Sequence, residues 1–413
     1  MALTDLTRTL DPRLAQLEQL RSQTKMWDAV IDEQQGRRIR VGDDWLIDWA
    51  SCNYLGLDLD PDVIAAVADQ VQRWGTHPGW SRMLGSPRQY VEIEERLAEL
   101  LGAPDTLVLP TISQIHVAVI PALVQKGTVF VESLAHKTVY DGCLHARGLG
   151  ATLERFRSGD LTQLEDQLRR SAVGPRLVCL DGVNSMTGNL PDLPAYAAVC
   201  REYDAILYVD DAHGFGVIGE RRPDESSPYG ARGNGIVRHL GLGYEDLVLV
   251  GGFSKAYSSL LAFLTVPTPV KNYLKVTAPT YLYSGPSPFA SLASVLVGMD
   301  VNERRGEDLR AHLYRLTRRL LDHVDALGVV TLNTDGTPIV ELPIARDRDL
   351  VEVADVLWRR GLFVTLAPYP GVPRDNVGFR IQVTAAHTEE QLEHLMGVLS
   401  DLAADGTLRA REG

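Results

Sequence analysis

Lys255 is the residue whose type and setting most directly suggest chemistry. It follows Ser254 just past the apolar run LVLVGG, in the segment Leu247 to Tyr257. A primary amine that is held at the end of a strand and partly desolvated can form a Schiff base with an aldehyde and can carry a proton. The sequence therefore predicts that Lys255 binds an aldehyde cofactor such as pyridoxal phosphate (PLP).

Asp210 ends another apolar run, AILYV, and is the second candidate. A carboxylate at the end of a buried strand needs a cationic partner, because burying it alone is costly. The protonated nitrogen of a pyridine ring is such a partner, and the ion pair keeps the ring able to accept electrons. The alternative is an ordinary strand-end aspartate that caps the next turn.

Four further polar residues suit the same chemistry. His213 can hydrogen-bond the phenolic oxygen of the cofactor or assist proton transfer, although a structural histidine is the alternative. Ser185 supplies a second donor near that oxygen, unless it is only a turn serine. The ring of His136 can stack on a pyridine. Arg380 can bind the carboxylate of an amino acid through two hydrogen bonds, with a surface salt bridge as the alternative.

The elements that position these residues alternate between short β-rich runs and helical stretches, which predicts an α/β domain with a mostly parallel sheet. Ligands of such sheets bind at the carboxyl ends of the strands, and the candidate residues follow strand ends. The expected strands are Thr106 to Pro110, Thr128 to Glu132, Arg176 to Gly182, Ala205 to Asp211 and Leu247 to Gly252, and the expected helices include Leu161 to Arg170 and Pro194 to Tyr203.

Three segments are expected along the chain: an N-terminal helical segment over 1–47, a large α/β domain over 48–289 that binds the cofactor, and a small C-terminal α+β domain over 290–413. The second boundary follows the proline-marked stretch Tyr283 to Phe289. The stretch Arg221 to Gly235, rich in glycine, proline and polar residues, is predicted to be a loop.

Bulk composition limits the function classes. A formal net charge of -13 over 413 residues argues against a nucleic-acid partner. The sequence contains no apolar run of transmembrane length and no signal-peptide pattern, so we expect a cytoplasmic protein that does not enter a membrane. The four cysteines are widely spaced, which predicts reduced thiols and no metal site.

Several segments, in order, resemble the α-oxoamine synthase family of fold-type-I PLP-dependent enzymes, from about Asn53 to the last helix. They are SCNYLGLDLDPDV, SRMLGS with YVEIEERLAELLG, LAHKTVYDG, DGVNSMTGNLPDL, VDDAHGFGVIGE, GGFSKA and FRIQVTAAHTEEQLE. The resemblance implies a mostly parallel central sheet with helices on both faces and a smaller C-terminal domain. It also implies a homodimer whose active sites are shared between the subunits.

The resemblance implies a role for each matching residue. Lys255 is the lysine that binds the cofactor, Asp210 contacts the pyridine nitrogen, and His136 stacks on the ring. His213 and Ser185 lie near the phenolic oxygen. Asn53 lies near the substrate and Arg380 binds its carboxylate.

The phosphate end departs from the family pattern. Thr111 and Ile112 stand where the family usually has a Ser-Gly pair, and His116 replaces an asparagine. Gly252 and Gly285 replace threonines that contact the phosphate. The donors expected there are Thr111, Ser113, Gln114, Ser254 and Ser258, and Ile112 lies at the same helix start. The chain is therefore identified as a divergent member.

The function implied by the resemblance is the condensation of an amino acid with an acyl thioester, carried by coenzyme A or by a carrier protein, with loss of carbon dioxide to give an α-amino ketone. Another carbanion reaction of an amino acid, such as transamination, racemisation, aldol cleavage or elimination, would use the same Lys255 and Asp210. A catalytically inactive partner subunit is the alternative from a different class.

Overall fold

The computed structural model describes residues 12–172, 174–223, 225 and 227–411. By its internal contacts the chain divides into two compact units. The smaller unit joins Met1–Cys52, Met186–Asn189 and Leu313–Gly413, and the larger unit joins Asn53–Ser185 and Leu190–His312. The boundaries expected at 47/48 and 289/290 stay a prediction.

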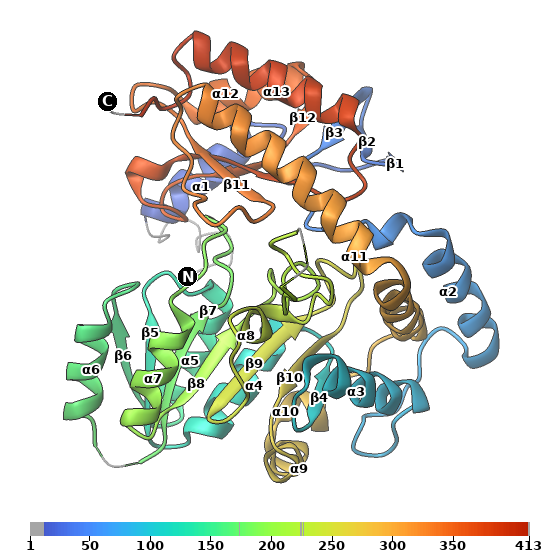
Figure 1. Ribbon diagram of the computed structural model, residues 1–413, viewed down its shortest axis with the longest axis vertical. Coiled ribbons are helices and arrows are strands. Elements are labelled where there is room, and N and C mark those ends of the chain that lie inside the picture. Colours follow the sequence, from blue (N-terminus) through green and yellow to red (C-terminus); the bar gives the residue numbers. More distant parts are fainter. Residues whose placement is uncertain (1–11, 173, 224, 226, 412–413) are drawn as a thin grey trace, which may run out of the picture. The chain divides into compact units, whose positions relative to one another are not determined.

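The larger unit is built on a seven-stranded sheet in the order β4-β10-β9-β8-β7-β5-β6 (Figure 1). All its strands run parallel except β10, which pairs antiparallel with both β4 and β9. The strands are β4 (Thr106–Leu109), β5 (Thr128–Glu132), β6 (Thr152–Phe156), β7 (Arg176–Asp181), β8 (Ile206–Asp210), β9 (Leu247–Gly252) and β10 (Ala262–Thr265).

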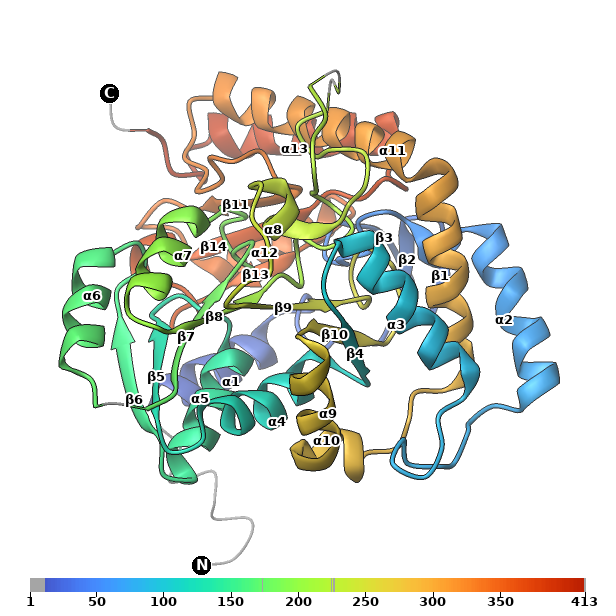
Figure 2. The same cartoon turned by 60° about the horizontal axis from the view of Figure 1, so that its bottom comes forward.

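Both faces of this sheet are buried, which explains why its strands are continuous apolar runs. On one face, Val129 and Val131 pack with α4 (Ile112–Val124) and α5 (Lys137–Gly148), which lie side by side in Figure 2. On the other face, Glu132 accepts a hydrogen bond from Tyr196 of α7 (Leu193–Glu202) at 2.9 Å.

The other helices of the larger unit surround the sheet, and α11 runs on into the smaller unit. They are η2 (Leu57–Leu59), α2 (Pro61–Trp74), α3 (Arg88–Leu101), α6 (Leu161–Arg170), α8 (Gly235–His239), α9 (Thr268–Thr277), α10 (Pro279–Leu282) and α11 (Phe289–Ala326).

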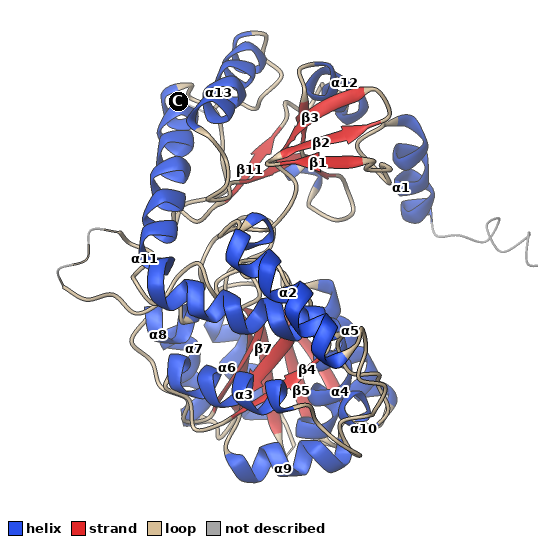
Figure 3. Cartoon of the chain, turned by 90° about the vertical axis from the view of Figure 1, so that its right-hand side faces the viewer, coloured by secondary structure: helices blue, strands red, loops and turns tan. Residues whose placement is uncertain are grey.

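The smaller unit holds two sheets, and Figure 3 shows β1, β2 and β3 side by side. The segment expected to be helical contains α1 (Pro12–Gln23) but also three strands, and residues 1–11 lie outside the described residues. β12 runs parallel to β3, so the C-terminal part of the chain completes the N-terminal sheet. The elements are β1 (Glu33–Gln35), β2 (Arg38–Val41), β3 (Asp44–Asp48), β11 (Ile339–Pro343), α12 (Leu350–Arg359), β12 (Leu362–Phe363), β13 (Thr365–Ala367), η3 (Arg374–Asn376), β14 (Gly378–Gln382) and α13 (Glu389–Ala404).

The expected fold class is confirmed: a mostly parallel sheet with helices on both faces, together with a smaller α+β unit. Among the described residues, no helix is both long enough and apolar enough to span a membrane. All four cysteines are free thiols in the structure.

Candidate active site

A pocket at the carboxyl ends of β7, β8 and β9 brings most of the predicted residues together. The open space within it is about 20 Å³, and the Ile112 side chain forms one wall. Of the predicted residues, Thr111, Ser113, Ser254, Asn53 and Arg380 do not line it. Its lining consists of Ile112, His136, Asp181, Val183, Ser185, Asp210, Ala212, His213 and Lys255.

Lys255 lies on a tight turn between β9 and β10. The turn is closed by backbone hydrogen bonds from Phe253 to Leu261 at 2.8 Å and from Ser258 to Lys255 at 2.9 Å. Beside it, the buried ring of Tyr257 stacks on Phe215 with centroids 5.2 Å apart. The turn therefore holds the backbone of Lys255 firmly while the side chain stays half-buried at the pocket.

Asp210 is the last residue of β8 and is almost completely buried. Its Oδ1 accepts a hydrogen bond from the backbone N–H of Ala212 at 3.0 Å, and its Oδ2 lies 2.9 Å from Nε2 of His116. Burial works to raise the pKa of Asp210, but His116, Lys255 and His136 outweigh it and lower that pKa. Asp210 is therefore an ionised carboxylate.

Asp181 sits beside Asp210 in the parallel register of β7 and β8, and no motif in the sequence assigned it a role. Burial, followed by repulsion from Asp210, raises the pKa of Asp181 well above its usual range. Its Oδ1 accepts the backbone N–H of His136 at 2.8 Å, whereas its buried Oδ2 has no hydrogen-bond partner among the described residues. The pKa values of two adjacent carboxyl groups are thus shifted in opposite directions.

The two histidines of the pocket are held differently. Nδ1 of His213 is 2.8 Å from the hydroxyl of the buried Tyr54, a contact that the sequence analysis missed. His136 is the N-cap of α5, where its Nδ1 accepts the backbone N–H of Thr138 at 3.3 Å. The His136 ring is exposed, so one of its faces is accessible for stacking.

The expected phosphate end lies at the start of α4. Thr111 is the N-cap, and its side chain accepts the backbone N–H of Gln114 at 3.4 Å. A Cβ on Gly252 would lie 3.6 Å from Cδ1 of Ile112, so these two departures from the family pattern are neighbours in space. Ser113 and Ser254 are exposed.

In the smaller unit, Arg380 on β14 lies directly opposite Glu341 on β11. Glu341 is buried, and burial raises its pKa to about 7 in spite of the nearby Arg380 and Arg409. Below about that pH the carboxyl is therefore neutral and does not neutralise the Arg380 charge.

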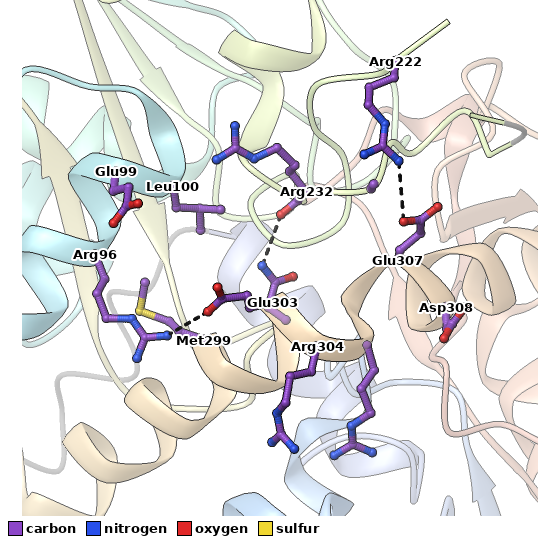
Figure 4. Close-up of a pocket in the computed structure, with 13 residues that line it drawn as sticks. Arg96, Glu99, Leu100, Arg222, Arg232, Met299, Glu303, Arg304, Glu307 and Asp308 are labelled. Atoms are coloured by element: carbon purple, nitrogen blue, oxygen red, sulfur yellow. Dashed lines mark hydrogen bonds and ion pairs between the residues drawn. The ribbon is translucent and has the colours of Figure 1, made fainter. Parts of the chain in front are cut away.

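A second and larger pocket, of about 430 Å³, lies in the larger unit away from these residues (Figure 4). It is walled by α3, α11 and the loop predicted over Arg221 to Gly235, in which residues 224 and 226 are not described. Its arginines are matched by acids: Arg96 is 2.7 Å from Asp300, and Arg222 is 3.8 Å from Glu307. The charges in this pocket compensate one another, and we assign no ligand to it.

The donor set of the first pocket fits PLP. The ionised Asp210 can pair with a protonated pyridine nitrogen, and the Lys255 amine can bond to an aldehyde. The buried Oδ2 of Asp181, which has no hydrogen-bond partner among the described residues, can accept a hydrogen bond from a bound polar group or donate one to it. Among the described residues there is no group of three or more His, Cys, Asp or Glu side chains placed to hold a metal ion.

Comparisons with known proteins agree with this chemistry. The family model described as aminotransferase class I and II matches residues 45–399. The 8-amino-7-oxononanoate synthase of Pseudomonas paraeruginosa is 36% identical over 375 residues, which cover 90% of this chain and 89% of that protein.

Two solved structures extend the comparison. A serine palmitoyltransferase variant from S. paucimobilis, with bound PLP and myriocin, matches with a TM-score of 0.86 and 25% identity over 97% of this chain and 99% of that chain. The 8-amino-7-oxononanoate synthase of Francisella tularensis shares the fold, with a TM-score of 0.72 and 20% identity over 87% of this chain and 98% of that chain. The chain belongs to the aminotransferase class I and II family and, within it, is a PLP-dependent transferase of the α-oxoamine synthase type.

Proposed function

We propose that the enzyme condenses an amino acid with an acyl thioester and releases carbon dioxide to give an α-amino ketone. The observation that carries the proposal is the pocket in which Lys255 and the ionised Asp210 meet at the ends of neighbouring parallel strands. The names of the relatives, 8-amino-7-oxononanoate synthase and serine palmitoyltransferase, support the same class of reaction.

When bound, PLP supplies an electron sink for the bond that is broken at the amino-acid α-carbon. Lys255 would hold the aldehyde carbon of the cofactor, and its Nζ would be the base that accepts the proton of the amino-acid α-carbon. Asp210 would keep the pyridine nitrogen protonated, and His136 would stack on one face of the ring.

The phenolic side of the cofactor is proposed to lie against His213 and Ser185, which both line the pocket. The hydroxyl of Tyr54 fixes the His213 ring through the contact of 2.8 Å, so its second nitrogen has a defined direction. This arrangement supports a role for His213 in holding or passing a proton at the phenolic oxygen.

We assign the amino-acid carboxylate to Arg380 and the region beside it to Asn53. Arg380 suits this role because a guanidinium can bind a carboxylate through two hydrogen bonds; burial raises the pKa of the facing Glu341 to about 7. At the phosphate end, Thr111, Ser113 and Ser254 are the proposed donors, together with backbone N–H groups at the start of α4 beside Ile112.

We further propose a cytoplasmic homodimer with shared active sites. Large apolar side chains are exposed on two segments of the larger unit, as expected for a surface that another subunit covers. Light scattering of the purified enzyme tests this, and a mass near 45.4 kDa would contradict it. The exposed side chains are Trp80 (53% exposed), Met83 (55%), Leu84 (75%), Val276 (70%) and Tyr283 (79%).

The test supplies PLP-loaded enzyme with a pool of amino acids and a pool of acyl-coenzyme A thioesters, and follows the release of free thiol. We expect release that requires both pools and that disappears in Lys255→Ala. Consumption of amino acids without a thioester would contradict the condensation and indicate another carbanion reaction. An acyl chain on a carrier protein is the second donor to be supplied.

A further inference from the structure

His116 lies on α4 beside the end of β8, and its side chain is fully buried. Its two ring nitrogens face two residues of the same strand. Nδ1 is 2.9 Å from the Tyr208 hydroxyl, and Nε2 is 2.9 Å from Oδ2 of Asp210. The imidazole therefore bridges a buried phenol and the carboxylate assigned to the cofactor.

The periodicity of the backbone makes this bridge possible. Tyr208 and Asp210 are two residues apart on β8, so both side chains point to the face that α4 covers. His116 lies one turn into α4, next to the buried Ile115, and its ring therefore points from the helix onto that face. The backbone of α5 packs closely behind it, since a Cβ on Gly142 would lie 2.6 Å from the carbonyl oxygen of His116.

The direction of the hydrogen bonds follows from the chemistry of the three groups. Burial raises the pKa of Tyr208 well above its usual range, so the phenol keeps its proton and donates it to Nδ1. The Asp210 carboxylate can only accept, so the ring nitrogen that faces it, Nε2, carries a proton. Nε2–H then donates to Asp210, and the donors run in one direction from Tyr208 through His116 to Asp210.

Together with the backbone N–H of Ala212, the Nε2–H of His116 fixes both oxygens of Asp210. An asparagine, which the family usually has at this position, has two amide hydrogens and a carbonyl oxygen, but it lacks the imidazole ring that places one nitrogen beside each partner. In this chain the ring connects the Asp210 carboxylate to a buried phenol.

We propose that His116 is a positioning residue that orients the Asp210 carboxylate toward the pyridine nitrogen of bound PLP, with Tyr208 selecting its tautomer. The proposal rests on the assignment of Asp210 to the cofactor. It adds two residues, on α4 and β8, that do not line the pocket. It also gives a structural role to His116, which replaces the asparagine of the family pattern.

The experiment measures the absorbance of PLP bound to the protein as a function of pH, and the dissociation constant of PLP, and needs no substrate. In His116→Leu we expect PLP to bind about tenfold more weakly or worse, the usual cost of one hydrogen bond to a charged group. The midpoint of the absorbance titration should also move. Unchanged affinity and an unchanged midpoint would overturn the proposal.

Two further variants separate positioning from packing. His116→Asn keeps a donor for Asp210 and is expected to recover affinity to within about threefold of the wild type. Tyr208→Phe should move the absorbance midpoint in the wild-type background but not in His116→Asn, because the bridge is then already broken. Equal shifts in both backgrounds would overturn the role of Tyr208.

Tyr244→Phe is the matched control, since the buried Tyr244 hydroxyl makes no hydrogen bond with the described residues and lies outside the pocket. It should leave the midpoint unchanged. The melting temperature of each apoprotein shows whether a variant is folded. If the wild type binds PLP but consumes no thioester, the proposed function is contradicted. The effect of His116 on PLP binding can still be measured in that case, because the binding assay needs no substrate.

Discussion

Glu341→Gln should change the pH dependence of stability in a way that the structure quantifies. Glu341 is 1% exposed on β11, and one of its carboxylate oxygens has no hydrogen-bond partner among the described residues. Burial, partly offset by Arg380 and Arg409, raises its pKa from 4.5 to about 7. A glutamine of the same shape is neutral at every pH.

The sign follows from the two pKa values. Below the unfolded value of 4.5, the carboxyl is protonated in both states and Glu341 carries no penalty. Between 4.5 and about 7 the unfolded chain loses this proton while the folded chain keeps it, so the free energy of unfolding decreases as pH rises. Above that window the penalty is complete and constant. At 1.36 kcal/mol for each pKa unit, the full penalty is about 3 kcal/mol.

Urea denaturation followed by fluorescence, from about pH 4 to about pH 8, measures this difference. The advantage of Glu341→Gln over the wild type should grow by about 3 kcal/mol across that range and then level off. Asp347→Asn, which neutralises an exposed carboxylate of the same unit, is the control and should show no such growth. Parallel curves for Glu341→Gln and the wild type would refute the raised pKa.

Three other variants test the account. Ile112→Gly should lower the dissociation constant of PLP, because it opens one wall of the pocket and exposes the N–H groups at the start of α4. Weaker binding would contradict this and would show that the Ile112 side chain stabilises the bound cofactor. For His136, Phe should preserve PLP affinity and Ala should reduce it by about tenfold, and equal losses in a binding titration would exclude stacking. Arg310→Met should lower the free energy of unfolding by about 3 kcal/mol, since the fully buried guanidinium donates to the carbonyls of Gly216 and Gly230 at 3.2 Å, and unchanged urea denaturation would contradict this anchoring.

The parallel strands of the larger unit could be predicted because both faces of the sheet are covered and the strands are short apolar runs between helices. β5 and β9 begin and end where they were expected. The sequence did not reveal β10, an antiparallel strand between β4 and β9, since parallel and antiparallel buried strands look alike in composition. It also did not reveal that Asp44–Asp48 pairs with Leu362–Phe363, because the two strands are far apart along the chain.

The sequence predicted the part of the candidate site that consists of residues at the ends of parallel strands. His136, Ser185, Asp210, His213 and Lys255 line one pocket because parallel strands end at one edge of the sheet. The supporting contacts were not predictable. Tyr54 and His213 are 159 residues apart, and His116 is 94 residues from Asp210, so no local spacing signals either pair. The raised pKa of Asp181 likewise depends on burial and on a neighbour from another strand.

The central claim is that this pocket holds PLP through Lys255. Borohydride reduction of the PLP-loaded enzyme fixes the cofactor to the amine that binds it, and peptide mass mapping then locates the modified lysine. The account predicts one pyridoxyl adduct, on Lys255 of the peptide that contains LVLVGGFSK, and none in Lys255→Ala. An adduct on one of the other lysines, or no adduct in a protein that retains PLP, would contradict it; those lysines are Lys25, Lys126, Lys137, Lys271 and Lys275.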